Sequence, residues 1–332
     1  HIAVIKDGTF TPQGIATHVV ESKYSDATYD LGQTTISGGT FNGTLYFAGA
    51  SPSLTISGGT FSDPHALDYL TAGANVNVRL LVDTELTKSV EMKQGTATFD
   101  LNGKRLTTTT AALRPGTTAD KEYTCAIQAN AGAKLTVENG FIGNKKDKLH
   151  YGIFSKGAAE IIIKNVDFGE MVHFAYNGSG GVGTLDATDC TFRGWLSAWW
   201  GGGKFTNCTF TIGKNWYPAA ICYGNTVFTG CKFFKNGVDS DVYDDTEHTD
   251  SDGYYRCDYT IAGCNPTTTI DFKDCKFMNE SGTVTDNVTK SNHPYHACDQ
   301  WGDGKPANAN VKVDGEEVTS KCSVATAAAS KQ

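Results

Sequence analysis

The chain has 332 residues, of which 39% are hydrophobic and 19% are charged, so it can bury a core and does not have the composition of a disordered chain. Its formal net charge of −8 argues against nucleic acid as a partner, since phosphate binding needs clustered Lys and Arg. It contains no run of about 18 apolar residues, so we expect no membrane-spanning helix. The 37 glycines and only 8 prolines favour short strands joined by tight turns.

Two features suit an extracellular protein. The chain has 10 cysteines, and it has Asn-x-Ser/Thr sequons at Asn42, Asn177, Asn207, Asn279 and Asn287. The first residue is His1, and the first ten residues already fit the repeat described next. We therefore expect the natural chain to begin upstream of His1.

The string TISGGTF occurs twice in the N-terminal part, beginning at Thr35 and at Thr55. Its last six residues fit a looser hexapeptide: an apolar residue, any residue, Asp, Asn or Gly, usually Gly or Cys, any residue, and Phe. This hexapeptide begins at Ile5, Ile36, Ile56, Ile163, Ala187, Phe205, Phe228 and Phe272, with a degenerate copy, VENGFI, at Val137. Eight of the 17 phenylalanines close one of these copies, and neighbouring copies follow one another at about 22 residues, which is near the length of one coil of a β-solenoid.

The copy FTNCTF explains how one hexapeptide turns a corner. In an extended strand alternate residues face the same side, so Phe205 is expected to point inward. Asn207 is expected at a bend with a left-handed backbone, which Asn, Asp and Gly tolerate best. Cys208 and Phe210 then point inward again. Stacked copies should place Phe on Phe, Cys or Gly on Cys, and Asn or Asp in a ladder along the bend.

A second strand is predicted before each hexapeptide in the middle of the chain. In successive copies the segment reads CAIQA, YGIFS, HFAYN, LSAWW, AAICY and DYTIAG, followed by turn-like links of varying length. Residues 123–280 therefore read as six consecutive coils, and the chain as an all-β parallel β-helix with coils of about 22 residues. An antiparallel sandwich is the alternative, but it does not predict Phe at a fixed offset from a bend.

The opening third carries a longer pattern: ISGGTF, then SDPHALDYLTAG, VNVRLLVDTEL and ATFDLNGKRLT. This order resembles surface proteins of gut bacteria and of some of their phage, in which it opens a right-handed parallel β-helix of the pectate-lyase-like class. The resemblance covers residues 36–110 best and implies a short helix near 63–73. Asp63 and Pro64 are predicted to start that helix as N-cap and first residue, and Gly73 to stop it. The fold class hosts lyases, hydrolases, adhesins and phage tailspikes, so the resemblance leaves the function open.

We divide the chain into three parts on these patterns. Residues 1–74 form an N-terminal β segment with the ISGGTF copies and the short helix. Residues 75–320 form the main β-helix, with a loop insertion near 237–256, because the last gap between hexapeptides is the longest. Residues 321–332 form a tail rich in Ala and Ser.

Aromatic residues form the first candidate site. They are Tyr176, Trp195, Trp199, Trp200, Trp216 and Tyr223. Because side chains alternate along a strand, one of Trp199 and Trp200 should face outward. The coil alignment places Trp200 beside Tyr223 and near Tyr176. An exposed aromatic column suits stacking against sugar rings; contact with another protein chain, or packing under loops, are the alternatives.

An acidic segment at residues 237–253 is the second candidate site. Its candidate Ca²⁺ ligands are Asp239, Asp241, Asp244, Asp250 and Asp252, since hard cations bind several carboxylate oxygens. A solvated acidic loop is the alternative, because the residue order of a known calcium loop is incomplete here. A catalytic role for Asp244 and Asp245 is a further hypothesis. No other cofactor is required by the sequence.

The cysteines fall into two groups. Cys190, Cys208, Cys231 and Cys275 share the fourth hexapeptide position and are predicted to form an inward column. Coils about 4.8 Å apart would permit disulfides there, but buried thiols also pack as small hydrophobes, which we prefer because Gly or Val fills this slot in other copies. Disulfides pinning loops are predicted for the second group: Cys257, Cys264, Cys298 and Cys322. A zinc site using His293 and His296 is the alternative, although the spacing fits no common zinc pattern.

The expected function is that of a non-enzymatic extracellular rod on a bacterial cell surface or a virion. It would be a surface adhesin or a phage fibre or decoration protein, which presents the aromatic face to a glycan or to another protein chain. A homotrimer would favour the phage fibre. The alternative is a polysaccharide lyase or glycoside hydrolase of the same fold class. Against it, the chain has only five arginines, at 79, 105, 114, 193 and 256, and none lies in a recognisable catalytic string.

Overall fold

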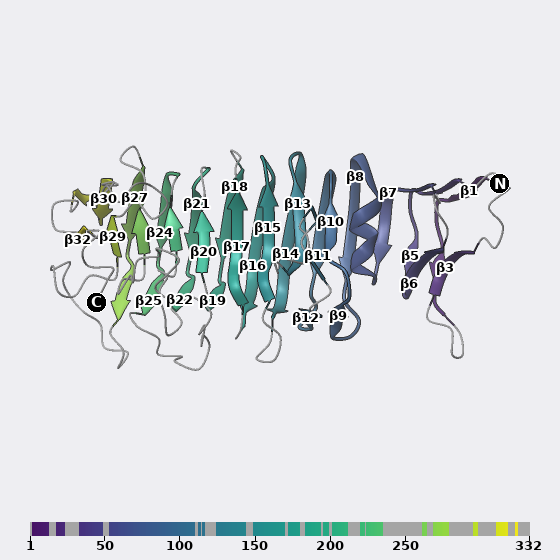
Figure 1. Ribbon diagram of the computed structural model, residues 1–332, viewed down its shortest axis with the longest axis horizontal. Coiled ribbons are helices and arrows are strands. Elements are labelled where there is room, and N and C mark those ends of the chain that lie inside the picture. The colour runs from purple at the N-terminus through teal and green to yellow at the C-terminus, as the bar shows by residue number, and fades with distance from the viewer. Residues whose placement is uncertain are drawn as a thin grey trace.

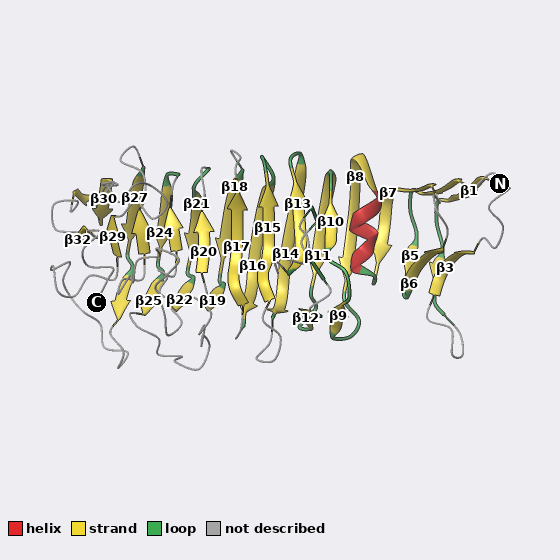
Figure 2. Cartoon of the chain, viewed as in Figure 1, coloured by secondary structure: helices red, strands yellow, loops and turns green. Residues whose placement is uncertain are grey.

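The computed structural model is an elongated stack of β-strands with the two termini toward opposite ends of its long axis (Figure 1). The structure describes residues 2–12, 18–23, 33–48, 53–109, 112–113, 115–116, 124–143, 149–169, 172–179, 183–193, 195–198, 201–211, 220–222, 224–234, 261–263, 268–278, 295–297, 310–317 and 323–324. Strands dominate this part of the chain, with one short helix among them (Figure 2).

Two sheets hold most of the described strands. A 21-stranded sheet contains β1 (Ile2–Ile5), β2 (Thr9–Phe10), β4 (Gln33–Ile36), β5 (Thr40–Phe41), β7 (Ser53–Phe61), β8 (Leu70–Arg79), β9 (Thr84–Leu86), β11 (Gly95–Asp100), β12 (Arg105–Thr108), β14 (Ala133–Ile142), β16 (Glu160–Phe168), β18 (Thr184–Thr188), β19 (Thr191–Arg193), β21 (Gly203–Thr206), β22 (Thr209–Thr211), β24 (Thr226–Thr229), β25 (Lys232–Phe234), β27 (Thr269–Lys273), β28 (Lys276–Met278), β30 (Asn310–Val313) and β31 (Glu316–Glu317). A nine-stranded sheet contains β10 (Val90–Met92), β13 (Cys125–Asn130), β15 (Leu149–Lys156), β17 (Val172–Ser179), β20 (Trp195–Ala198), β23 (Ala220–Cys222), β26 (Ile261–Gly263), β29 (Tyr295–Ala297) and β32 (Ser323–Val324). A small third sheet pairs β3 (His18–Lys23) with β6 (Thr44–Ala48).

Neighbouring strands in these sheets run parallel, and among the described strands only β30 and β31 pair antiparallel. The nine-stranded sheet contains the six predicted second strands in chain order, from β13 to β26. The hexapeptides lie in the large sheet, where β16, β18, β21, β24 and β27 pair in succession. The prediction of an all-β chain is confirmed, and its strands are mostly parallel.

The bend of the later hexapeptides has the predicted left-handed backbone. The φ angles are 60° at Asn139, 52° at Asn165, 54° at Asp189 and 54° at Asn207. Gly230 follows with 63° and Asp274 with 52°, in the same third position. Asn and Asp hold this conformation at low cost because their short polar side chains bond locally. Of these bend residues, Asn139 and Asn165 are hydrogen-bonded to each other as a ladder requires.

The early copies bend one residue later, which differs from the prediction. In the two ISGGTF copies the positive φ belongs to the fourth residue, 101° at Gly39 and 123° at Gly59. The third residue is glycine for another reason, since a Cβ on Gly58 would lie 2.6 Å from the carbonyl oxygen of Ser37. The two glycines of ISGGTF therefore have different roles. The first leaves space for a carbonyl oxygen of the preceding layer, and the second adopts the positive φ of the bend.

The phenylalanines form more than one stack, so the prediction of a single Phe column is wrong. Phe10, Phe41 and Phe61 stack with ring centroids 4.9 Å apart. Phe61 then pairs with Val78 of β8, and that row continues through Phe99 to the opening residues of the later copies. A separate stack contains the closing residues Phe168, Phe192, Phe210 and Phe233 at 5.0–5.1 Å.

The two rows of rings meet in the core. Phe228 stacks on Phe205 at 5.0 Å and on Phe272 at 5.2 Å, and its edge contacts Phe210 and Phe233. All of these rings are buried. Offset stacking along each row and edge contacts between rows are the two arrangements that aromatic quadrupoles favour.

The predicted helix is shorter than expected. It is a 3₁₀-helix, η1, spanning Pro64–Tyr69, with Asp63 as N-cap and Pro64 in the first turn, as predicted. Gly73 does not stop it; Leu70 is already extended, and Gly73 lies within β8 with φ 79°, where the register with β7 shifts. The boundary proposed after residue 74 falls inside β8, and the large sheet continues across it through the β7–β8 pairing. No helix in the described part of the chain has the length and apolar character needed to span a membrane.

Candidate functional site

The predicted aromatic site lies mostly outside the described residues. Four of its residues are not described: Trp199, Trp200, Trp216 and Tyr223. For Tyr176 and Trp195 the structure describes only the position in the strand. Tyr176 in β17 pairs with Leu196, and Trp195 in β20 pairs with Phe174. The partner of Tyr176 on the following strand is thus not the tryptophan that the coil alignment placed near it. The aromatic face stays a prediction.

The predicted metal and loop sites also lie outside the described residues. This holds for the calcium candidates Asp239, Asp241, Asp244, Asp250 and Asp252, and for Cys257, Cys264, His293, Cys298 and Cys322. Of the zinc candidates only His296 has a described backbone, in β29. Within the described ranges, no group of three or more His, Cys, Asp or Glu side chains is placed to hold a metal ion.

The structure offers another candidate site, a shallow depression of about 670 Å³ along the asparagine corner. Its lining comes from five successive layers of the large sheet, from Arg79 of β8 to Thr191 of β19. Strands in a sheet lie about 4.8 Å apart, so the depression is roughly 19 Å long and follows the long axis of the stack. The bend residues Asn102, Asn139 and Asn165 line it. We name it the corner groove.

Amide and carboxylate side chains in the corner groove bond to one another along the axis. The Nδ2 of Asn165 donates to Oδ1 of Asn139 at 3.3 Å, and the Nδ2 of Asn139 donates to Oδ1 of Asp100 at 3.3 Å. In these bonds Asn139 uses one N–H and its oxygen, and Asn165 uses one N–H. An Asn amide carries two N–H donors and an oxygen with two lone pairs, so both side chains keep hydrogen-bonding capacity for a ligand. The row therefore presents donors and acceptors at each layer.

One end of the groove is closed by an ion pair. The Nε of Arg79 lies 3.5 Å from Oδ2 of Asp100, and its Nη2 donates to Oδ1 of Asn102 at 2.8 Å. Asp100 also accepts the backbone N–H of Asn102 at 2.8 Å. Arg79 and Asp100 thus hold the first bend in place.

An exposed aromatic ring forms one wall. Phe141 of β14 is 38% exposed, and Arg105 of β12 lies over its ring at 4.9 Å from the centroid. The Nη1 of Arg105 donates to the carbonyl oxygen of Gly143 at 2.6 Å, which fixes the guanidinium there. Leu81 and Val82, which follow the groove residue Arg79 in the chain, are 49% and 67% exposed.

The groove carries more negative than positive charge. Its lining contains Arg79 and the carboxylates Asp100, Asp167 and Asp189, so the formal balance is 1 − 3 = −2. The sequence pattern indicated the Asn and Asp ladder but not its use as a site. A signal for Phe141 was present: in VENGFI the Phe stands at the fifth position, which faces outward, instead of the sixth.

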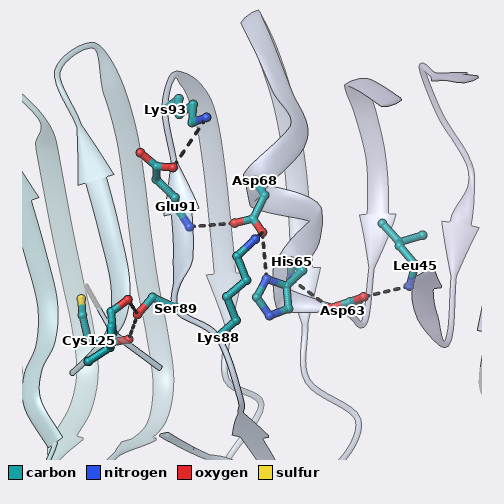
Figure 3. Close-up of polar contacts among 10 residues, drawn as sticks. Leu45, Asp63, His65, Asp68, Lys88, Ser89, Glu91, Lys93 and Cys125 are labelled. Carbon is teal, nitrogen blue, oxygen red and sulfur yellow. Dashed lines mark hydrogen bonds and ion pairs between the residues drawn. The ribbon is translucent and has the colours of Figure 1, made fainter. Parts of the chain in front are cut away.

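A second polar cluster surrounds η1 (Figure 3). Asp63 accepts the N–H of His65 at 2.9 Å and that of Leu45 in β6 at 2.8 Å. Asp68 contacts Nδ1 of His65 at 2.8 Å and accepts the N–H of Glu91 in β10 at 2.7 Å. Burial by itself would lower the pKa of His65, but the hydrogen bond to Asp68 and the charges of Asp68 and Asp63 outweigh burial and raise it. The cluster joins η1 to strands on both sides.

Two further contacts in Figure 3 are also structural. The Nζ of Lys88 lies 4.0 Å from Oδ2 of Asp68. The hydroxyl of Ser89 is buried and lies within hydrogen-bonding distance of the carbonyl oxygens of Cys125, Ala112 and Leu113. Such contacts satisfy backbone oxygens where the chain crosses between the sheets.

No protein-family model matches the sequence, and neither the curated proteins nor the solved structures searched contain a match.

Proposed function

We propose that the chain is a right-handed parallel β-helix that acts as a non-enzymatic extracellular rod and binds a glycan in the corner groove. The parallel pairing of successive layers and the recurrence of the hexapeptide bend support the fold. Solution scattering from the purified protein should report a rod, and the profile of a compact sphere would contradict the fold.

The observation that carries the proposed function is an exposed ring beside a row of amide groups that line the same groove. A sugar has apolar faces that stack on aromatic rings and an edge of hydroxyls that both donate and accept hydrogen bonds. Phe141 supplies the ring, and Asn139 and Asn165 supply the donors and acceptors beside it. The same combination fits a flat hydrocarbon ligand poorly, because the amides would lose water without a new partner.

The shape of the groove favours a chain over a single small molecule. It is shallow, it follows the rod axis and it repeats similar groups in five layers. Pockets for small ligands are deeper and more apolar. We therefore assign the groove to an extended polysaccharide that contacts several layers at once, so that weak contacts add up along the chain.

The charge of the groove narrows the class of polysaccharide. Asp167 and Asp189 lie in it, while its only arginine is already paired with Asp100. A polyuronate or a phosphorylated glycan would meet like charge there. We therefore propose a neutral or amino-bearing glycan. Uronate polymers, the substrates implied by the pectate-lyase-like resemblance, are expected to bind weakly.

Binding to a panel of insoluble and immobilised polysaccharides, both neutral and acidic, tests this proposal. Phe141→Ala and Asn139→Ala should each weaken retention on the bound glycan by about five- to tenfold, since a stacking or hydrogen-bonding contact contributes roughly 1–1.5 kcal/mol. Lys134→Ala is the matched control, because Lys134 lies on β14 outside the groove and pairs with Glu160. Equal retention by wild type and Phe141→Ala would contradict the proposed site.

The groove also supports the alternative hypothesis that the protein is an enzyme, because it holds three carboxylates and an arginine in one depression. Glycoside hydrolysis needs two carboxylates that flank the scissile bond, about 5–9 Å apart. We favour binding without catalysis because Asp100 and Arg79 are engaged in the contacts that hold the bend. Release of reducing or unsaturated ends from the panel, lost in Asp167→Asn or Asp189→Asn, would establish the enzyme instead.

The location and assembly follow from the same proposal. We propose a bacterial cell surface or a virion, on the basis of the sequons, the cysteines and the resemblance of residues 36–110. Partners would be cell-surface or host glycans, and other protein chains if the aromatic residues between Tyr176 and Tyr223 form a face. Light scattering distinguishes the versions: a homotrimer favours a phage fibre, and a monomer favours a bacterial surface protein.

A further inference from the structure

The four cysteines of the hexapeptides lie side by side in the core, one layer after another. The residues that follow them pair in register, Thr191 with Thr209 and Lys232 with Lys276 among them. The carbonyl oxygens of Cys190, Cys208 and Cys231 accept backbone N–H groups from the next layer at 2.8–2.9 Å. Each cysteine is therefore about 4.8 Å from the next, the spacing of neighbouring strands.

The thiols of this column hydrogen-bond backbone oxygens of an earlier layer. Cys208 donates to the carbonyl oxygen of Ala187 at 3.6 Å, Cys231 to that of Phe205 at 3.4 Å and Cys275 to that of Phe228 at 3.5 Å. All four are thiols and not disulfides in the structure.

The four cysteines differ in exposure along the column. Cys190, Cys208 and Cys231 are buried, with exposed fractions of 2%, 0% and 0%. The layer before Cys190 places the apolar Val166 at the same position, and Val166 is buried too. Cys275 is partly exposed. In the next layer the bend residue Asp314 leads into Gly315 and the antiparallel strand β31. Of the four cysteines, Cys275 is therefore the one that an oxidant can reach.

We propose that this thiol column is a redox-modification site, which a low-molecular-weight disulfide oxidises from the Cys275 end into the pairs Cys190–Cys208 and Cys231–Cys275. In the first step the Cys275 thiolate attacks oxidised glutathione, breaks its S–S bond and releases one glutathione thiolate, which takes a proton. Cys231 then attacks the sulfur of Cys275 and releases the second glutathione. Two protein thiols are oxidised and one oxidised glutathione is reduced to two glutathiones.

The buried pair is oxidised by relay. Cys208 attacks Cys231 in the first disulfide, and Cys190 then attacks Cys208, so the bond moves inward and the thiols of Cys231 and Cys275 are restored. A second oxidised glutathione then closes the outer pair. The strand spacing lies within the usual Cα range of about 4.4–6.8 Å, but an in-register pair leaves the Cβ atoms about 4.8 Å apart, beyond the usual range of about 3.5–4.5 Å. The bonds should therefore be strained, and a mild thiol reductant should reopen them.

The test is incubation of the folded protein with oxidised glutathione at neutral pH, followed by alkylation, digestion and mass spectrometry. We expect peptides linked through Cys190–Cys208 and Cys231–Cys275, each lighter by two hydrogens than its reduced parts, with an unchanged circular dichroism spectrum. A column that stays alkylatable after denaturation, or that is oxidised only in unfolding concentrations of urea, would overturn the proposal.

Two matched variants test the direction of entry, since each leaves three thiols in the column. Cys190→Ala keeps the accessible end, so Cys231–Cys275 should form at the wild-type rate and Cys208 should remain a thiol. Cys275→Ala removes the accessible end, so oxidation of the remaining three should fall by at least tenfold. Equal rates in the two variants would refute entry at Cys275. Both should fold, because Gly140 and Val166 fill the equivalent position in earlier layers.

Discussion

The same substitution at two hexapeptide glycines should have opposite effects. Gly59→Asn places a side chain at φ 123°, in the region that side chains rarely adopt, and its Cβ would lie 3.1 Å from the ring of Phe61 and 3.2 Å from the carbonyl oxygen of Gly39. Backbone strain of this kind costs about 1–3 kcal/mol and the overpacking about 1–3 kcal/mol. We expect a loss of roughly 3 kcal/mol or more in the free energy of unfolding of this layer.

Gly230→Asn is the control. Its φ of 63° is the left-handed conformation that Asn207 and Asp274 already hold in the two neighbouring layers. The one close contact of a new Cβ is the side-chain Oδ1 of Asn207 at 2.7 Å, which can rotate away. Replacing Gly also reduces the entropy of the unfolded chain by about 0.4–1 kcal/mol, so the net change should stay within about 1 kcal/mol of zero.

Amide hydrogen exchange measures the stability of each layer separately. It suits a stack in which each layer contacts mainly its neighbours. The reporters are the amide of Thr60, bonded to Gly39 at 2.9 Å, and the amide of Lys232, bonded to Cys208 at 2.9 Å. In Gly59→Asn the Thr60 amide should exchange roughly 100-fold faster, as 1.4 kcal/mol corresponds to about tenfold. An unchanged Thr60 amide, or equal damage by Gly230→Asn, would refute the assignment of the bend.

Three further predictions concern the core and the contacts around η1. Phe228→Ala removes a buried ring that contacts four others and should cost about 3–5 kcal/mol in urea unfolding, while Phe141→Ala at the surface should cost less than about 0.5 kcal/mol. The pKa of His65 is raised above its ordinary 6.5, so protonated His65 stabilises the fold. This stabilisation is complete below pH 6.5 and is lost as the pH rises through the pKa of the folded state. His65→Gln should remove that part of the pH dependence of the melting temperature. Ser89→Ala removes the one hydroxyl proton that the nearby buried carbonyl oxygens share, and it should lower the free energy of unfolding by about 1–3 kcal/mol, measured by urea denaturation.

The sequence predicted most of the local structure because that structure depends on single residues and their immediate neighbours. Asn139, Asn165 and Asn207 occupy left-handed bends as the pattern indicated, since few residue types tolerate that backbone. Cys208 is buried because it lies two residues before an inward Phe. Asp63 caps η1 because Asp before Pro satisfies the first N–H groups of a helix.

The candidate site was predicted less well. The aromatic residues chosen from the sequence lie mainly outside the described residues. The corner groove, by contrast, is built from residues of five layers that are far apart in the chain, from Arg79 to Thr191. A groove depends on which side chains end up next to one another across layers, and a spacing pattern within one copy does not contain that information. In the sequence, the sign of Phe141 was the degenerate copy VENGFI, in which Phe stands at the fifth position instead of the sixth.

What the sequence by itself determined is the repeat: where each bend falls in a later copy, which residues face inward, and that the chain consists of short strands. What only the tertiary structure decided is how the copies align with one another. ISGGTF and FTNCTF look alike as strings, yet Phe61 pairs with Val78 and so joins the row of Phe205, the opening residue of a later copy, and not that of Phe210, which closes it. The reason is the shift of register between β7 and β8 around η1. The register of two strands depends on which backbone groups pair, so two similar hexapeptides can pair in different registers.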